Sequence, residues 1–303
     1  MGFLLHATAE GGRTFSDFLS EVILHGFLDT LKVIPFLFLT YLVMEFIEHK
    51  ASDKTRALME KAGSLGPVAG GLLGAVPQCG FSAMAANFYT GRVITAGTML
   101  AVFLSTSDEM LPIMLSGSVR PAAILAILGY KILIGIIAGF ILDFALKLSK
   151  REREHINIDE ICDNDNCHCE RGIFLSALHH TLTVGGFVLI ATLAISTLVF
   201  FIGEENLASI MYDKPVISHL IAAAFGLIPN CAASVLLTNL CVGRLITAGT
   251  MISGLFSGAG VGLLVLFKVN KRQKENLLFV VLLLIIGTIF GLFADFIDIG
   301  ALI

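Results

Sequence analysis

One hydrophobic segment occurs twice in the chain, and this duplication constrains the fold more than any other feature of the sequence. Residues 74–99 align without a gap with residues 226–251, and 13 of the 26 aligned residues are identical. Proline stands at the same place in both copies, as Pro77 and Pro229. A duplicated apolar unit with matching proline breaks is typical of secondary transporters.

The repeat extends over nearly the whole chain. The same offset pairs Ser105 with Ser257, Gly135 with Gly287, Gly139 with Gly291 and Asp143-Phe144 with Asp295-Phe296. We therefore expect two copies of one transmembrane unit, residues 21–148 and 173–303. A surface segment, residues 1–20, would precede them, and a cytoplasmic loop that contains Cys and His, residues 149–172, would join them.

The composition indicates a membrane protein. Apolar residues make up 56% of the chain and charged residues 15%, whereas soluble domains carry about 25% charged residues. Eight apolar stretches are long enough to cross a bilayer, because a transmembrane helix needs about 20 residues. These stretches are 25–47, 65–90, 93–116, 121–148, 173–202, 215–241, 244–268 and 276–298.

The charges of the connecting loops predict how these stretches cross. The loops 48–63, 147–171 and 268–274 are rich in Lys and Arg, whereas 203–214 is acidic. Loops rich in Lys and Arg are expected on the cytoplasmic side. Eight simple crossings would put the first two basic loops on opposite sides of the membrane, which conflicts with this rule.

Two re-entrant hairpins resolve the conflict. If 65–90 and 215–241 each enter and leave on one side, all three basic loops are cytoplasmic and the acidic loop is external. Each arm of the first hairpin would have about 12 residues, or about 18 Å of helix, which is about half a bilayer. The tips would lie at Pro77 and Pro229, because proline interrupts a helix.

Each copy then crosses the membrane three times, so the second copy is inserted upside down. The predicted fold is an all-α integral membrane protein with two inverted-topology repeats. Each repeat has three membrane-crossing helices plus a re-entrant helical hairpin, and both termini lie outside. We expect a multi-pass protein of the cell's inner (plasma) membrane, with the lipid bilayer as its surroundings.

The strongest candidate site is the pair of hairpin tips. Thiols are soft ligands for a thiophilic metal or metalloid, whereas amides and hydroxyls suit hard cations. Broken helices also expose backbone groups that bind ions. The alternative is that the cysteines only pack as small buried hydrophobes. Opposed tips would bring together Gln78, Cys79 and Ser82 from one copy and Asn230, Cys231 and Ser234 from the other.

A second candidate is the acid pair Asp108-Glu109, inside an apolar stretch. Carboxylates at membrane depth are costly and mark functional sites. The second copy has Gly260-Val261 at these positions, and this asymmetry fits a single site for a cation or for proton coupling. The alternative is that the acid pair caps a short helix near the outer surface.

A third candidate is His179-His180, at the start of the second copy. Asp29 aligns with His180 after a shift of one residue. Histidine binds metals and relays protons near neutral pH. A solvated pair at a helix end is the alternative.

The central loop is the fourth candidate. Cys162, Cys167, His168 and Cys169 lie within eight residues, and Cys- and His-rich tracts bind metals. The spacing is not that of a standard zinc finger. The alternative is a charged linker with incidental cysteines.

Two repeated pairs of charged residues are expected to be structural. Arg92 and Arg244 begin the matched helices, and we interpret them as interface anchors. Asp143 and Asp295 are interpreted as marking helix ends at the interface.

Three segments carry a resemblance to a known family. They are Val76-Pro77-Gln78-Cys79-Gly80-Phe81-Ser82, Gly91-Arg92-Val93-Ile94-Thr95 and Phe103-Leu104-Ser105-Thr106-Ser107-Asp108-Glu109-Met110-Leu111-Pro112. With the central loop and the histidine pair, they resemble the putative ten-transmembrane heavy-metal exporter family, whose members are described as arsenic efflux proteins or manganese transporters. The resemblance spans the whole chain and implies efflux from the cytoplasm. Six crossings and four hairpin arms also make ten helices.

The predicted function is therefore secondary-active export of a heavy metal or metalloid by alternating access at the hairpin tips. The transported ion is the substrate, and we expect no cofactor, no catalytic residue and no nucleic-acid partner. Proton antiport through the acid pair or the histidines is the simplest coupling. ATP hydrolysis is not expected, because the chain has no glycine-rich lysine motif.

The sequence leaves several alternatives open. The substrate is Mn²⁺, another divalent cation or arsenite, and the oligomeric state is undetermined. In a second hypothesis, the protein transports an organic or inorganic anion, which binds at the helix ends that face the tips. An intramembrane enzyme is the alternative from a different class of protein, and a metal sensor or a channel is a further one.

Overall fold

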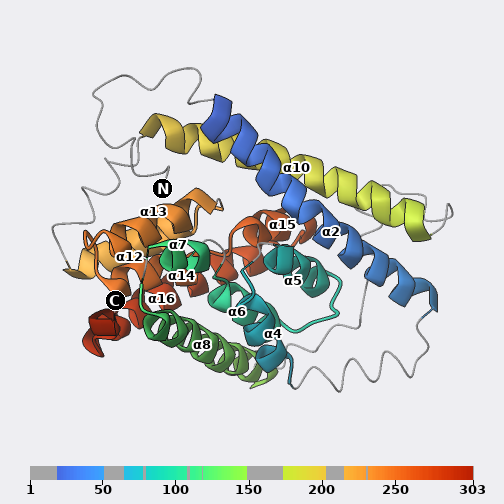
Figure 1. Cartoon of the computed structure of the whole chain (residues 1–303). Helices are drawn as coiled ribbons and strands as arrows, with labels where there is room; N and C mark the ends of the chain where they lie inside the picture. The colour runs from blue at the N-terminus through green and yellow to red at the C-terminus, as the bar shows by residue number, and fades with distance from the viewer. Residues whose placement is uncertain are drawn as a thin grey trace.

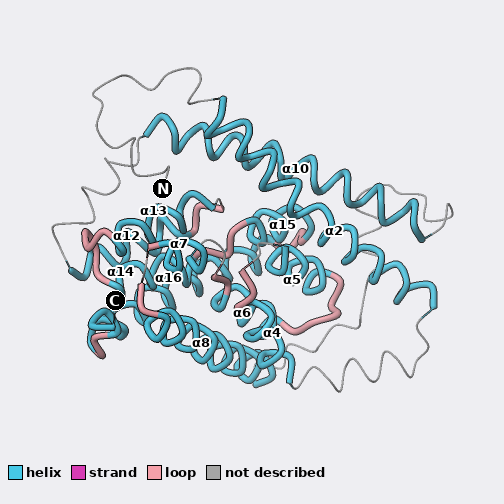
Figure 2. Tube along the Cα trace, in the orientation of Figure 1, coloured by secondary structure: helices cyan, strands magenta, loops and turns pink. Residues whose placement is uncertain are grey.

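The structure, a computed structural model, describes most of the predicted transmembrane part of the chain. The described residues are 19–50, 65–77, 80–107, 110–117, 119–148, 173–202, 215–229 and 231–302. All secondary structure in these ranges is helical (Figures 1 and 2). The predicted N-terminal segment up to residue 18 and the predicted loop 149–172 lie outside the described residues.

The helices occur in the same order in both copies. The first copy contains η1 (Leu19–Leu24), α2 (His25–Lys50), α4 (Gly66–Gly74), α5 (Gly80–Thr90), α6 (Ala96–Ser105), α7 (Met110–Ser116) and α8 (Pro121–Leu148). The second copy contains α10 (Ile173–Ile202), α12 (Pro215–Gly226), α13 (Cys231–Val242), α14 (Ala248–Ser257), α15 (Val261–Val269), α16 (Gln273–Phe296) and η4 (Ile299–Leu302).

Six helical stretches of the described chain are long and apolar enough to cross a bilayer. They are Val22–Val43, Ala96–Ser116, Pro121–Leu148, Phe174–Ala194, Ala248–Val269 and Gln273–Phe296. These stretches coincide with the six predicted crossings, so the prediction of six candidate spans is confirmed.

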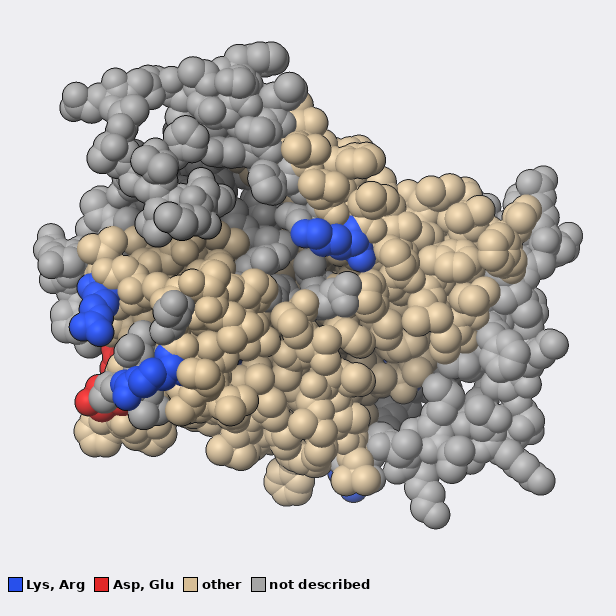
Figure 3. Space-filling view, viewed as in Figure 1, with Lys and Arg blue, Asp and Glu red and all other residues tan. Residues whose placement is uncertain are grey.

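Large apolar side chains cover the outside of the long helices. Ile141 of α8, Ile190 of α10 and Leu277 of α16 are 63%, 70% and 61% exposed. The face seen in Figure 3 shows few charged side chains among the described residues. Soluble proteins rarely expose apolar surface of this extent, so the described exterior suits contact with lipid.

The apolar stretches 65–90 and 215–241 are each divided into two short helices. Pro77 lies in the break between α4 and α5, and Pro229 lies in the break between α12 and α13. Proline interrupts a helix because it lacks an N–H group and its ring clashes with the preceding turn. The four helices have 9 to 12 residues, or about 14–18 Å, so each is about half as long as a bilayer is thick.

α4 lies along α6 and runs in the same direction. A Cβ atom on Gly66 would meet the side chain of Thr98, and one on Gly74 would meet Ser105. The first turns of the two helices are therefore neighbours, and so are their last turns. The matched helices α12 and α14 pack in the same way.

The crossings predicted over 93–116 and 244–268 are each divided in two, which the sequence analysis did not anticipate. α6 ends at Ser105 and α7 begins at Met110, whereas α14 ends at Ser257 and α15 begins at Val261 (Figure 2). In the second copy, Gly260 turns the chain with a φ of 53°, a conformation that glycine adopts easily. Hydropathy averaged over a window of about 20 residues does not register such short breaks.

Glycine contacts join α6 to α8 and α14 to α16. A Cβ atom on Gly97 would overlap the carbonyl oxygen of Gly139, and one on Gly249 would overlap that of Gly291. Small residues allow helix backbones in a membrane to approach this closely. The repeated glycines of the sequence are thus explained by one helix contact that occurs in both copies.

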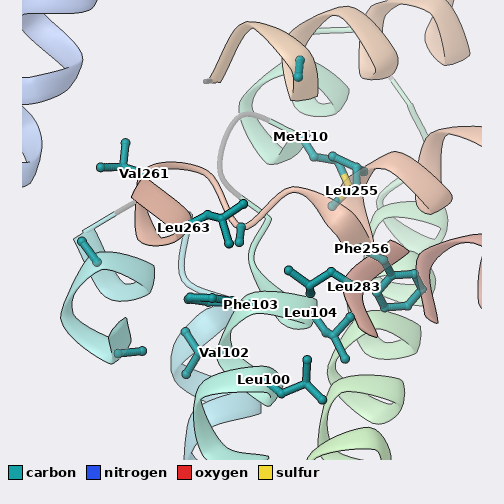
Figure 4. Close-up of a cluster of buried hydrophobic side chains, with 14 of the residues drawn as sticks. Leu100, Val102, Phe103, Leu104, Met110, Leu255, Phe256, Val261, Leu263 and Leu283 are labelled. Atoms are coloured by element: carbon teal, nitrogen blue, oxygen red, sulfur yellow. The ribbon is translucent and has the colours of Figure 1, made fainter. Parts of the chain in front are cut away.

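The two copies also pack against each other. α5 of the first copy packs on α15 of the second, and α7 of the first packs on α13 of the second. α2 and α10 lie side by side along one flank and cover α5 and α15 (Figure 1). The buried core in Figure 4 draws on both copies and includes Leu104, Met110, Leu255, Val261 and Leu283.

The glycine contact predicts a specific loss of stability. Gly97→Ala should lower the Tm of the purified protein in detergent, because overpacking a tight contact costs about 1–3 kcal/mol. Gly129→Ala is the matched control, since a Cβ atom there has no neighbour within 4 Å and alanine favours helix by about 1 kcal/mol. Equal Tm values for the two variants would contradict the contact.

Candidate transport site

Most of the predicted ligand residues lie outside the described residues. The assignments made for them, including the metal site of the central loop, stay predictions. Within the described ranges, no three His, Cys, Asp or Glu side chains gather as metal ligands. The residues outside are Gln78, Cys79, Asp108, Glu109, Cys162, Cys167, His168, Cys169 and Asn230, together with the side chain of Cys231.

Of the tip residues, the side chains of Ser82 and Ser234 are described. Ser82 is buried in the first turn of α5, and a side chain on Gly262 at the start of α15 would collide with it. Ser234 is half-buried in the first turns of α13. Ser82 therefore lies where the short helix of the first copy meets the helix break of the second copy.

His179 and His180 have different surroundings. His180 is buried and stacks on Tyr41 of α2, with ring centroids 5.2 Å apart, whereas His179 is exposed. The Tyr41 hydroxyl donates to Oδ1 of Asn87 in α5 at 3.1 Å. The structure thus connects α10, α2 and α5 through buried polar side chains. The sequence analysis missed Tyr41 and Asn87, although Asn87 recurs in the second copy as Asn239.

Buried hydroxyls gather at the end of α6, directly before the acid pair. Ser105, Thr106 and Ser107 are at most 4% exposed. The Thr106 hydroxyl donates to the carbonyl of Val102 at 2.7 Å, and the Ser107 hydroxyl donates to that of Ser105 at 3.0 Å. The Ser107 hydroxyl thus satisfies a carbonyl at the end of the helix, where the last carbonyls lack an N–H partner within the helix. This part of the predicted acid site is therefore inside the protein.

Lys131 of α8 is a buried cation beside this helix end, and the sequence analysis missed it. Its side chain is fully buried. The ammonium group donates to the carbonyl oxygen of Thr106 at the end of α6 and, at 3.2 Å, to that of Leu255 in α14. The signal was present in the sequence, because a lysine interrupts a long apolar stretch where the second copy has Leu283.

Asp143 and Asp295 lie at helix ends, as predicted, and hold the starts of the neighbouring helices. Asp143 accepts from the Thr95 hydroxyl at 2.7 Å and from an N–H of the first turn of α6 at 2.8 Å. Asp295 makes the same two bonds to α14, at 2.5 and 2.6 Å. A carboxylate is favourable at the positive end of a helix dipole. In the second copy only, where the first has Pro67, Nε2 of His219 lies 3.1 Å from Asp295.

Glu275, in the first turn of α16, connects the two copies. It accepts from the Tyr89 hydroxyl at 2.8 Å, and it forms ion pairs with Arg92 at 3.3 Å and with Arg272 at 3.5 Å. Tyr89 and Arg92 belong to the end of α5, in the other copy. Ala123 occupies the position of Glu275 in the first copy, so this cluster is not repeated.

Arg92 and Arg244 adopt positive φ angles of 58° and 59°. Each follows the end of a helix, at the position that glycine usually takes. In the first copy, the Val93 N–H donates to the Phe88 carbonyl of α5 at 2.8 Å. A residue other than glycine is strained there by about 1–2 kcal/mol. Arg92 pairs with Glu275, whereas Arg244 is exposed, and the interpretation of both as interface anchors stays a prediction.

One comparison with known proteins is decisive. A family model described as "Putative, 10TM heavy-metal exporter" matches residues 16–202, which is more than half of the chain. The chain belongs to this family. No curated protein and no solved structure gives a significant match.

The match to the 10TM exporter family confirms the resemblance that the three sequence segments carry. It covers the first copy, the central loop and the first helix of the second copy. Membership and the six apolar spans together identify the chain as a multi-pass membrane protein.

The two strained arginines of this family member provide a matched test of the Glu275 cluster. Arg244→Gly should raise the Tm, because it removes about 1–2 kcal/mol of backbone strain from an exposed residue. Arg92→Gly removes the same strain but also the pair with Glu275, so its Tm should lie below that of Arg244→Gly. An equal rise for both variants would mean that the Glu275 cluster adds no stability.

Proposed function

We propose that this protein is a secondary exporter of a heavy-metal or metalloid ion, located in the inner membrane and working by alternating access. The observation that carries the proposal is the meeting of two broken helices, one from each copy, at buried polar groups. The ends of α6 and α14 approach each other at Lys131, beside the buried hydroxyls of Ser107 and Ser257. Discontinuous helices near the middle of the membrane are where secondary transporters bind substrates and coupling ions.

The packing of α4 supports the re-entrant arrangement. Gly66 at the start of α4 lies beside Thr98 at the start of α6, and α5 leads within a few residues to that same start. A hairpin that leaves one end of α6 and returns to it does not cross the membrane. The same reasoning applies to α12 and α13, which return to the start of α14.

The contacts of α16 support the inversion of the second copy. Its first turn pairs with Arg92, just before α6, and its last turn bonds to Thr247, just before α14. α16 has 24 residues, or about 36 Å of helix. The starts of α6 and α14 therefore lie at opposite ends of a membrane-spanning helix, and the two helices enter from opposite sides.

The substrate site would be formed by the hairpin tips and the acid pair. In this proposal Cys79 and Cys231 supply soft ligands, and Asp108 and Glu109 supply charge for the ion or for an exchanged proton. The position of Ser82 supports the proposal, because this tip residue of the first copy lies against Gly262, just after the helix break of the second copy. The ion would leave the cytoplasm.

Labelling with an impermeant maleimide tests the inverted topology. In a chain whose six native cysteines are replaced by alanine, we expect Val93→Cys, which is half-buried, to react only from the cytoplasmic side and Leu245→Cys, which is exposed, only from the outside. Both residues lie in the matched turns before α6 and α14. Reaction of both from the same side would exclude the inverted repeat.

Transport by inverted membrane vesicles tests the site. Vesicles should accumulate radioactive Mn²⁺ or arsenite. Cys79→Ser, Cys231→Ser or Asp108→Asn should reduce the initial rate by at least about tenfold, because even the loss of a group that only orients a ligand costs about 10–100-fold. Cys241→Ser is the control, because Cys241 is buried at the other end of α13. Normal transport by all three site variants would refute the site assignment. If anions raise the Tm of the purified protein but neither metal nor arsenite does, an anion transporter is favoured.

A further inference from the structure

The Lys131 ammonium lies between the carbonyl ends of two helices from different copies. It donates to the carbonyl of Thr106, which caps α6, and to that of Leu255 in the last turn of α14. The side chain is fully buried, and Nζ lies 6.0 Å from the centre of the Phe256 ring. Each of these groups is one that attracts a cation, since helix C-termini carry partial negative charge and aromatic faces are electronegative.

The break in α14 leaves the Leu255 carbonyl available. In a continuous helix this carbonyl would accept from the N–H of Ala259, four residues later. Here the Ala259 N–H bonds to Ser257 instead, at 2.9 Å. An unsatisfied carbonyl inside a membrane protein is costly, and Lys131 supplies the missing donor. The helix break and the lysine therefore depend on each other.

The second copy has no cation at the matched position. Leu283 stands where the first copy has Lys131, and it is also fully buried. The hydroxyl of Ser257 donates to the Leu283 carbonyl at 3.2 Å, which links α14 to α16. The charge is thus confined to one of the two matched positions.

We propose that the space between the Thr106 and Leu255 carbonyls is a site for a monovalent cation, and that the Lys131 ammonium is its tethered occupant. The site takes a primary ammonium group or an alkali ion of similar charge when the lysine is absent. Lys131 thereby replaces a free cation at the point where the broken helices of the two copies meet. The existence of this site does not depend on the exporter function; only its use in transport rests on that proposal.

A chemical-rescue experiment tests the site. The atoms that Lys131→Ala removes are those of propylammonium, so this amine fits the vacated space. We expect Lys131→Ala to have a lower Tm than the wild type and propylammonium to raise it by about 2–4 °C in a saturable way. Propanol and tetramethylammonium should not do so, because neither places a charged N–H donor between the carbonyls. The wild type should not respond.

Leu283→Ala is the matched control, because it opens a space at the equivalent position of the other copy without removing a charge. An equal response of Leu283→Ala to propylammonium would overturn the proposal, and so would no response of Lys131→Ala.

If Lys131→Ala does not fold, Lys131→Leu tests the site instead. This variant introduces the residue of the second copy and still leaves the Thr106 and Leu255 carbonyls without the ammonium donor. Sodium should then raise the Tm relative to N-methylglucamine, in this variant only, and no difference would overturn the site. These Tm measurements do not depend on transport. Failure of the exporter proposal would be seen separately, as the absence of metal or arsenite uptake by wild-type vesicles.

Discussion

The structure depends on satisfying backbone groups where helices stop inside the membrane part of the protein. Water is absent there, so every free carbonyl or N–H group needs a partner from the protein. Lys131 donates to a carbonyl at each of the breaks after α6 and α14, and Ser107 donates to the Ser105 carbonyl at the first break. Because Lys131 comes from α8 and reaches both breaks, the position of one broken helix constrains that of the other.

Some contacts occur in both copies, whereas others occur in one copy only. The Gly97–Gly139 contact and the carboxylate that holds the start of α6 both recur in the second copy, and they build the common scaffold. Lys131, Glu275 and His219 have no equivalents at the matched positions. In the transporter proposed above, these are the positions at which the two halves would differ in how they bind an ion. We therefore look for function where the repeat fails.

The large-scale features could be predicted because each rests on a local pattern. Eight apolar stretches follow from apolar length, the loop charges reduce the crossings to six, and the breaks at Pro77 and Pro229 follow from the stereochemistry of proline. The break after Ser105 could not be predicted in this way, because apolar residues continue on both sides of it. Lys131 lies outside the repeated motifs, and only its position inside a long apolar stretch distinguishes it in the sequence.

The sequence by itself determined the membrane class, the duplication, the family and the helix breaks that proline causes, since composition, identity and local stereochemistry are written along the chain. Only the tertiary structure decided that Lys131 meets Thr106 and Leu255, and that Glu275 meets Tyr89 and Arg92. These partners are separated by 25 to 186 residues, and no periodicity relates them. Their meeting follows from how the helices of two copies pack, which is a property of the whole fold.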